Sequence, residues 1–324
     1  MEWRESSSRQ LGINSELRDE LDPDIRRFVT EMTAAWARHG DLAAVSPAVA
    51  RCIAEKVRAP WARGGPQMAR ITELHVLAAN GAVRVRCYEP DPDGPKPVLI
   101  YLHGGGWTLF SLDTHDRVMR EYAARAGVMV AGVDYALSPE AKYPVALEQV
   151  VAVARFFGEQ NARIAIGGDS AGANLALSAC LRLRDERQSQ LIRAMVLNYG
   201  VFDRWSSAEA HDRYGGPGNM LTSEEMESFW RNYLRDERDA DDPLVCPLRA
   251  DLHDLPRALL VVPEFDLLTE QSLGLADRLE AAGIAVQLEI YRGATHSFLE
   301  AVSIAPLADR AFDDTANWLR PAVA

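Results

Sequence analysis

From residue 72 onward, short apolar segments alternate with segments of helical length, and this alternation limits the possible folds more than any other feature. Two apolar segments joined at Asn80-Gly81 come first and predict a β-hairpin, because both turn residues tolerate positive φ. The later segments are nearly continuous apolar runs, which is typical of strands buried on both faces of a sheet. The expected strands are 74–79, 82–88, 98–102, 128–133, 164–167, 194–199, 259–262 and 286–291.

Segments with the length of helices separate the later strands, at 114–126, 144–157, 171–186, 270–282 and 306–319. A hairpin followed by this alternation predicts an α/β fold with an open, mostly parallel, eight-stranded sheet flanked by helices.

Two regions fall outside the alternation. Residues 1–70 contain one amphipathic segment, expected as a helix over roughly 24–38, followed by prolines and glycines that punctuate the chain. The excursion at about 203–240 contains Thr222 and Glu225 in the spacing of a capping box, and it is too long for a plain connection. We expect this excursion to join the N-terminal helices as a lid over the carboxyl edge of the sheet.

Composition excludes several classes of protein. A net charge of −12 argues against broad nucleic-acid binding and against adsorption to anionic membranes. The N-terminus has no apolar signal-peptide region, and no uncharged apolar run is long enough to span a membrane, so a cytoplasmic location is expected. The four cysteines are widely scattered without a CxxC, which predicts buried or half-buried free thiols rather than a metal or redox site.

The strongest catalytic signal is the G-x-S-x-G motif at Gly168–Gly172, between an apolar strand and a helix-length segment. At a sharp strand–turn–helix, glycines flank the serine because side chains there would collide as the chain doubles back. The serine hydroxyl is then exposed near the positive end of the helix. An ordinary Gly/Ser turn shares the bare motif, but the flanking strand and helix favour Ser170 as a nucleophile.

A second glycine-rich segment, His103-Gly104-Gly105-Gly106-Trp107, directly follows the expected strand at 98–102. Glycines at a strand end let backbone N–H groups point into a cavity, as an oxyanion hole requires. Gly104 and Gly105, together with the N–H of Ala171, are the candidate donors. The segment lacks the spacings of nucleotide-binding loops, which disfavours a phosphate site. We expect His103 to brace the loop rather than to act as a base.

A serine nucleophile needs a base, and in α/β-hydrolases the chain order is serine, acid, histidine. Three histidines follow Ser170 in the chain. His296 lies just after the last expected strand, at the catalytic edge of the sheet, and is the candidate base. His211 lies in the suspected lid and His253 in a polar stretch, so both are weaker candidates.

For the acid, Asp266 follows the strand at 259–262 and is favoured to hold the imidazole, with Glu264 as the alternative that could instead brace the loop. Trp107, Phe110 and Phe298 could line a substrate pocket, although aromatics at such positions are more often simple core. No metal-ligand pattern is present in the sequence, so no metal site is expected.

Taken together, these motifs resemble the hormone-sensitive-lipase-like esterases, the bacterial family IV carboxylesterases of the α/β-hydrolase superfamily. The resemblance covers about residues 70–320 and rests on 103–107, 111–116, 134–140 with Tyr143-Pro144, 168–172, Asp266 and His296. It implies catalytic Ser170, Asp266 and His296, oxyanion donors at Gly104, Gly105 and Ala171, and no cofactor. It also implies a helical cap, formed by residues 1–70 and an insertion at about 203–240, on a catalytic domain of residues 71–324.

The chain departs from the family pattern at five positions. Glycine is common in the family where this chain has Phe110, Ala173 and Ser297. Arginine is usual in place of Ala136, so a structural ion pair could be missing, and proline is frequent in place of Leu267. No triad member is lost, but Phe110 and Ser297 could narrow or re-polarise the pocket.

The expected function is a serine carboxylesterase that hydrolyses short-chain acyl esters of small molecules through an acyl-enzyme. The same tetrahedral intermediate serves a lactonase or an amidase, which the motifs do not separate. A ligand-binding receptor on the same scaffold is a third hypothesis; it would be expected to lack a triad member, and all three are present here. Many members of the resembled family are dimers, so a homodimer is the expected assembly.

Overall fold

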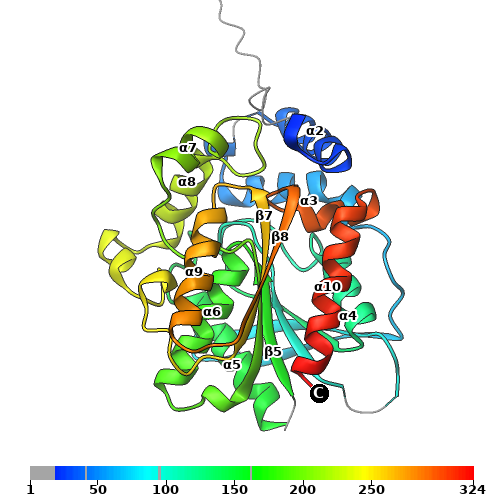
Figure 1. The fold of residues 1–324 in the computed structure, drawn as a ribbon, viewed down its shortest axis with the longest axis vertical. Helices are drawn as coiled ribbons and strands as arrows, with labels where there is room; N and C mark the ends of the chain where they lie inside the picture. The colour runs from blue at the N-terminus through cyan, green and yellow to red at the C-terminus, as the bar shows by residue number, and fades with distance from the viewer. Residues whose placement is uncertain (1–18, 41, 94–95, 161–162) are drawn as a thin grey trace, which may run out of the picture.

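The computed structural model describes residues 19–40, 42–93, 96–160 and 163–324 (Figure 1). Eight strands form one sheet in the order β1-β2-β4-β3-β5-β6-β7-β8. They are β1 (Arg70–Ala78), β2 (Gly81–Glu89), β3 (Val98–Leu102), β4 (Met129–Asp134), β5 (Ile164–Asp169), β6 (Ile192–Asn198), β7 (Arg257–Phe265) and β8 (Val286–Thr295). β2 pairs antiparallel with both β1 and β4, and every other pair is parallel. The predicted hairpin and the mostly parallel eight-stranded sheet are both confirmed.

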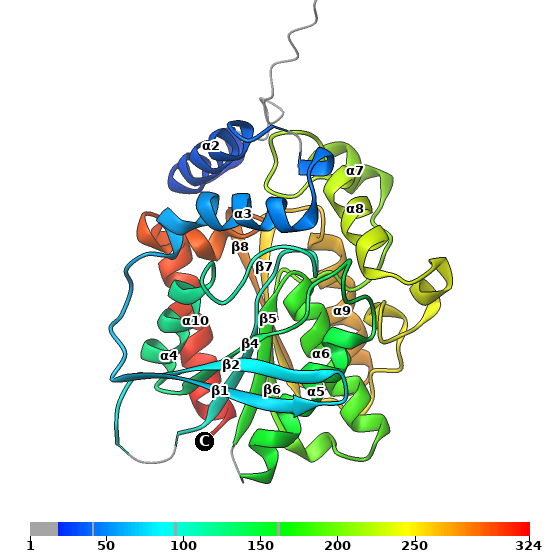
Figure 2. The ribbon, with the colours of Figure 1, turned by 180° about the vertical axis from the view of Figure 1, so that it is seen from behind.

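Helices cover both faces of this sheet, as the two opposite views show (Figures 1 and 2). One face carries α4 (Asp116–Ala126) and α10 (Pro306–Ala322), and the other carries α5 (Val145–Glu159), α6 (Ala171–Asp185) and α9 (Thr269–Ala281). Every residue of β3 and β5 is therefore buried. Burial on both faces explains why these strands are continuous apolar runs rather than alternating ones.

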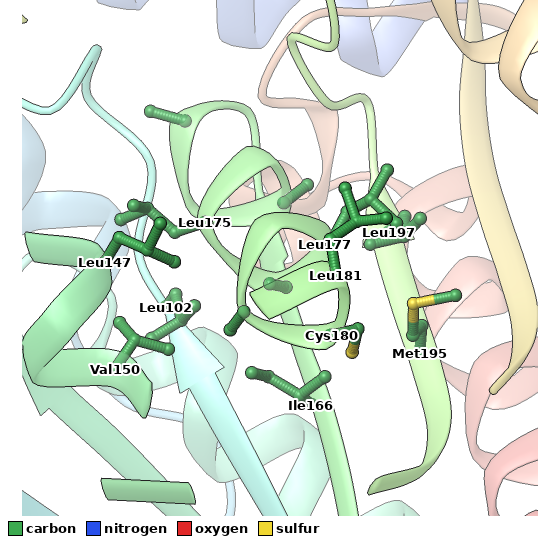
Figure 3. Close-up of a cluster of buried hydrophobic side chains, with 14 of the residues drawn as sticks. Leu102, Leu147, Val150, Ile166, Leu175, Leu177, Cys180, Leu181, Met195 and Leu197 are labelled. Carbon is green, nitrogen blue, oxygen red and sulfur yellow. The ribbon is translucent and has the colours of Figure 1, made fainter. Parts of the chain in front are cut away.

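Helix α6 is packed into the centre of the core, directly after the candidate nucleophile. Figure 3 shows its apolar side chains between strands of the sheet and the neighbouring helix α5. The labelled residues are Leu102, Leu147, Val150, Ile166, Leu175, Leu177, Cys180, Leu181, Met195 and Leu197. Truncation of one such leucine to alanine typically costs about 2–5 kcal/mol, so this packing stabilises the position of α6, which begins directly after Ser170.

Four further helices lie at the end of the sheet where β7 and β8 finish (Figures 1 and 2). They are α2 (Pro23–Ala37), α3 (Pro47–Ala62), α7 (Ala208–Tyr214) and α8 (Ser223–Tyr233). The described residues also include short 3-10 segments: η1 (Leu42–Ala44), η2 (Ser189–Leu191), η3 (Glu237–Asp241), η4 (Pro247–Arg249) and η5 (Phe298–Ser303). Helix α2 occupies the predicted range, and α8 begins with the predicted capping box between Thr222 and Glu225.

The sequence does not predict helix α3, because its prolines indicate breaks in the chain. Pro47 occupies the first turn, where a backbone N–H has no intrahelical acceptor and the fixed φ of proline suits the helix. Pro60 lies in the last turn, so its missing N–H affects the helix close to its natural end. Both prolines are thus compatible with one helix.

In the described part of the chain, no helix combines the length and the apolar character needed to cross a bilayer. Cys87, Cys180 and Cys246 are buried free thiols, as expected. The prediction is wrong for Cys52, which is also a free thiol but lies on the exposed side of α3.

Candidate active site

Ser170 lies in the sharp turn between β5 and α6, with φ 53° and ψ −117°. A non-glycine residue in this region costs about 1–3 kcal/mol and persists where the surroundings fix it. The backbone N–H of Ser170 donates to the carbonyl of Asn198 at 2.9 Å. A Cβ atom on Gly168 or on Gly172 would overlap the carbonyl oxygen of Leu102. Glycine at both flanking positions is therefore what lets the turn approach β3.

The hydroxyl of Ser170 meets His296, which directly follows β8. Ser170 Oγ lies 3.1 Å from His296 Nε2, and His296 Nδ1 lies 2.7 Å from Asp266 Oδ2. All three side chains are buried. With Nδ1–H donated to the carboxylate, Nε2 is left as the acceptor for the serine proton. This is the arrangement that general-base activation of a serine requires.

The two carboxylates at the end of β7, Glu264 in its last residues and Asp266 directly after it, take different partners. The second oxygen of Asp266, Oδ1, accepts the backbone N–H of Leu268 at 3.1 Å, which fixes the carboxylate that faces His296. Glu264 instead accepts the backbone N–H of Gly293 at 2.9 Å, so it braces β8. The structure therefore brings Asp266, rather than Glu264, to the histidine.

The other two histidines that follow Ser170 lie elsewhere. His211 of α7 bonds through Nδ1 with Ser223 Oγ at 2.6 Å. His253 is exposed and pairs with Asp251 at 2.5 Å. Neither is brought to the serine.

The loop after β3 folds back tightly over the end of β5. Gly105 has φ +103°, a conformation that side chains rarely allow, and its carbonyl accepts the N–H groups of Thr108 and Leu109 at 3.0 and 2.9 Å. A Cβ on Gly104 would overlap the carboxylate of Asp169. Ala171 is the first residue of α6, so its N–H has no intrahelical acceptor. These three backbone groups lie on the two segments that meet beside Ser170.

His103 braces this loop through hydrogen bonds, in agreement with its predicted role. Its Nδ1–H donates to the carbonyl of Gly104 at 2.8 Å, and its own carbonyl accepts the hydroxyl of Tyr135 at 2.7 Å. The rings of His103 and Tyr135 stack at 4.4 Å. Burial, with a further contribution from nearby His115, lowers the pKa of His103 to about 3. The imidazole is therefore a neutral donor at ordinary pH.

The sequence analysis does not single out Asp169, a buried charged residue directly before Ser170. Asp169 accepts the hydroxyl of Tyr101 at 2.9 Å and lies 3.3 Å from His115 Nε2. Burial opposes both charges, but their mutual attraction wins: the pKa of His115 is raised and that of Asp169 is lowered. The one sequence signal for Asp169 is its place inside the G-x-S-x-G motif.

The three aromatics proposed for the pocket occupy different environments. Trp107 is fully buried and stacks on Tyr233 at 4.2 Å, and Phe298 is fully buried beside Tyr291. Phe110 is half-buried, at the end of the glycine-rich loop. Their role as pocket residues stays a prediction, and the burial of Trp107 and Phe298 favours a packing role for these two.

Two of the positions where the chain departs from the family pattern have left-handed backbones. Phe110 has φ 71° and Ser297 has φ 61°. Glycine adopts this conformation without steric cost, whereas other residues are disfavoured there by about 1–2 kcal/mol. These side chains therefore place strain next to the glycine-rich loop and next to His296.

At Ala136, where the family usually has arginine, the backbone N–H donates to Gln149 Oε1 at 2.7 Å. Glu140 of the same segment is ion-paired with Arg51 of α3 at 2.6 Å. Arg51 also donates to the carbonyls of Thr108 and Ser138, both at 2.8 Å. The N-terminal helix α3 is thereby bonded to this segment and to the loop after β3.

No group of three or more histidine, cysteine, aspartate or glutamate side chains suited to a metal ion occurs among the described residues.

Comparison with known proteins places this site in a family. Residues 99–300, more than half of the chain, match the family described as alpha/beta hydrolase fold. The chain belongs to the α/β-hydrolase family. Acetyl esterases of Salmonella schwarzengrund and Salmonella choleraesuis are each 37% identical to this α/β-hydrolase, over 80% of its length and 82% of theirs.

Solved structures of esterases have the same fold. A hyperthermophilic esterase from the archaeon Pyrobaculum calidifontis matches with a TM-score of 0.87 and 30% identity, over 94% of this chain and 99% of that one. EstE1, a thermostable carboxylesterase from a metagenomic library, matches with a TM-score of 0.83 and 30% identity, over 87% of this chain and 99% of its own. The resemblance to hormone-sensitive-lipase-like esterases is confirmed, and the protein is a carboxylester hydrolase.

Proposed function

We propose that this α/β-hydrolase cleaves small esters with short acyl chains through a covalent acyl-enzyme on Ser170. The observation that carries the proposal is the continuous hydrogen-bond chain from Ser170 Oγ through His296 to Asp266. The acetyl esterases among its relatives support a short acyl group.

The mechanism follows from the position of each group. Ser170 Oγ attacks the ester carbonyl while His296 Nε2 takes its proton, and Asp266 stabilises the imidazolium that forms. His296 then gives the proton to the leaving alcohol, which leaves an acyl group on Ser170. A water molecule, deprotonated by His296, releases the acid in a second pass through the same steps.

The negative oxygen that develops on the carbonyl needs donors that are already oriented. The backbone N–H groups of Gly104, Gly105 and Ala171 are the proposed donors, since they belong to the two segments that meet beside the serine. Loss of one such donor typically costs about 10²–10³ in turnover. The neutral ring of His103 holds the carbonyl of Gly104 and so keeps this loop in place.

The helices at the carboxyl edge of the sheet support the assignment of a cap. Residues before about 70 supply α2 and α3, and the excursion at about 203–240 supplies α7 and α8. The ring of Phe229 in α8 lies against Gly106, where it would overlap a Cβ atom. An aromatic ring in this place leaves little room beside the glycine-rich loop, which favours short acyl groups.

The experiment is hydrolysis of p-nitrophenyl acetate, butyrate, octanoate and palmitate by the wild-type protein and by Ser170→Ala. We expect the highest kcat/KM at acetate or butyrate and no turnover by the variant, with an unchanged thermal unfolding midpoint. Full activity of Ser170→Ala would refute the proposal. Faster turnover of matched lactones or amides than of esters would instead assign the same machinery to a lactonase or an amidase.

A further inference from the structure

Arg58 of α3 carries a buried positive charge. It contacts the end of the glycine-rich loop and the segment that follows His296. Its guanidinium is ion-paired with Glu300 of η5, and each side chain is only 5% exposed. The guanidinium carbon also lies 4.5 Å from the centre of the Phe110 ring. Glu300 follows His296 by four residues, and Phe110 ends the loop that contains Gly104 and Gly105. One arginine of an N-terminal helix thus joins the segment of the base to the segment of the proposed oxyanion donors.

Each partner of Arg58 is linked to a left-handed backbone: Phe110 has one itself, and Glu300 follows Ser297, which has one, by three residues. Phe110 has φ 71°, and a Cβ on Gly105 would lie 2.6 Å from its Cδ2, so the ring and the Gly105 backbone are in tight contact. Ser297 has φ 61°, and its carbonyl accepts the N–H of Glu300 at 3.1 Å. Such conformations persist only where the surrounding structure fixes them. Arg58 is placed to do so at both turns.

The buried guanidinium of Arg58 is stabilised by these two contacts. Among the described residues, its Nε finds no hydrogen-bond acceptor. A buried guanidinium is stabilised by a carboxylate partner and by an aromatic face, which are the contacts that Glu300 and Phe110 supply. Arg51 fixes the same helix further along, through the carbonyl of Thr108. Helix α3 therefore holds the glycine-rich loop at two points and the His296 segment at one.

We propose that Arg58 and Glu300 are positioning residues: their ion pair, seated on Phe110, sets the geometry of the oxyanion donors and of His296 together. The proposal rests on the esterase mechanism given above and goes beyond it, because a cap helix here governs the rate of turnover as well as access. Neither side chain is proposed to touch the substrate.

The test is the double variant Arg58→Met/Glu300→Gln, which removes the pair without leaving one buried charge unpartnered. The concentration of functional active sites is first measured by titration with a p-nitrophenyl phosphonate. The value of kcat is then calculated per titrated site, so that unfolded protein does not lower it. On p-nitrophenyl acetate we expect kcat per titrated site to fall about tenfold while KM stays within twofold, since an interaction felt mainly in the transition state lowers kcat. The rate constant of phosphonylation should fall by a similar factor, because that reaction also places an anionic oxygen at the donors.

Arg27→Met is the matched control, because Arg27 forms an exposed ion pair with Glu31 on the neighbouring helix α2. It should keep the wild-type kcat per site. If the double variant also keeps the wild-type kcat per site, or loses activity only through a smaller number of titratable sites, the positioning role is wrong.

A second variant keeps the test decisive if the double variant does not fold. Phe110→Leu preserves the ion pair but removes the aromatic ring beneath it, and we expect kcat per site to fall several-fold. An unchanged kcat in Phe110→Leu would overturn the proposal. Failure of the esterase mechanism itself is distinguishable, because the wild-type protein would then not be titrated by the phosphonate.

Discussion

At the scale of single residues, the site is decided by which of two neighbouring carboxylates reaches His296. Asp266 and Glu264 both follow the apolar part of β7, so their order in the sequence does not separate them. The pairing of β7 with β8 shifts register between Pro263 and Phe265, and the two side chains then meet different partners. Asp266 contacts the imidazole, whereas Glu264 holds the backbone of Gly293.

Replacing these carboxylates one at a time tests that assignment. Asp266→Asn should lower kcat by about 10³–10⁴, because an amide no longer stabilises the imidazolium or the required tautomer of His296. Glu264→Gln keeps an acceptor for Gly293 and should retain activity within a few-fold. Steady-state kinetics on p-nitrophenyl acetate decides between them, and a larger loss in Glu264→Gln than in Asp266→Asn would reverse the two roles.

At the scale of elements, hydrophobic periodicity located the sheet and most of the helices. It also places the G-x-S-x-G motif in a turn between a strand and a helix, because the apolar patterns of β5 and α6 are both clear in the sequence. It missed α3, because Pro47 and Pro60 carry the same local signal in a helix end as in a loop. The contact of Arg58 with Glu300 was beyond prediction, because nothing local in either segment marks the partner of a buried charge.

The tight turn before α6 predicts different effects on folding for substitutions at two neighbouring residues. Gly172→Ala should prevent normal folding, because the new methyl group would overlap the carbonyl of Leu102 in the rigid strand β3. The next residue offers the control: Ala173→Gly should fold with a loss of about 1 kcal/mol, the usual cost of glycine in a helix. Soluble expression and urea unfolding measure both effects. A Gly172→Ala protein with wild-type stability would show that the turn is not as tightly packed as described.

At the scale of the whole molecule, the buried histidines link stability to pH. Folded His103 binds a proton only near pH 3, because burial disfavours its charged form, whereas an unfolded histidine binds one below about pH 6.5. The unfolded chain therefore holds more protons between these values, so acid lowers the free energy of unfolding. His115, whose pKa is raised, is charged in both states well below pH 6.5 and adds little slope there.

His103→Asn should accordingly flatten the loss of stability between pH 6.5 and pH 4.5, by at most about 1.4 kcal/mol per pH unit. Asparagine keeps a donor for the carbonyl of Gly104 but does not titrate. The exposed His39 is the control site, and His39→Asn should keep the wild-type slope. Urea unfolding at several pH values supplies the free energies, and an equal slope in both variants would contradict the burial argument.

Covalent trapping tests whether Ser170 is the nucleophile of this esterase. The protein is incubated with a p-nitrophenyl phosphonate, its intact mass is measured, and the modified peptide is sequenced by mass spectrometry. We predict one phosphonyl group per chain, attached to Ser170, with loss of ester hydrolysis in proportion to labelling. Complete inactivation with the label on another residue, or full labelling of Ser170 with activity retained, would show that Ser170 is not the nucleophile.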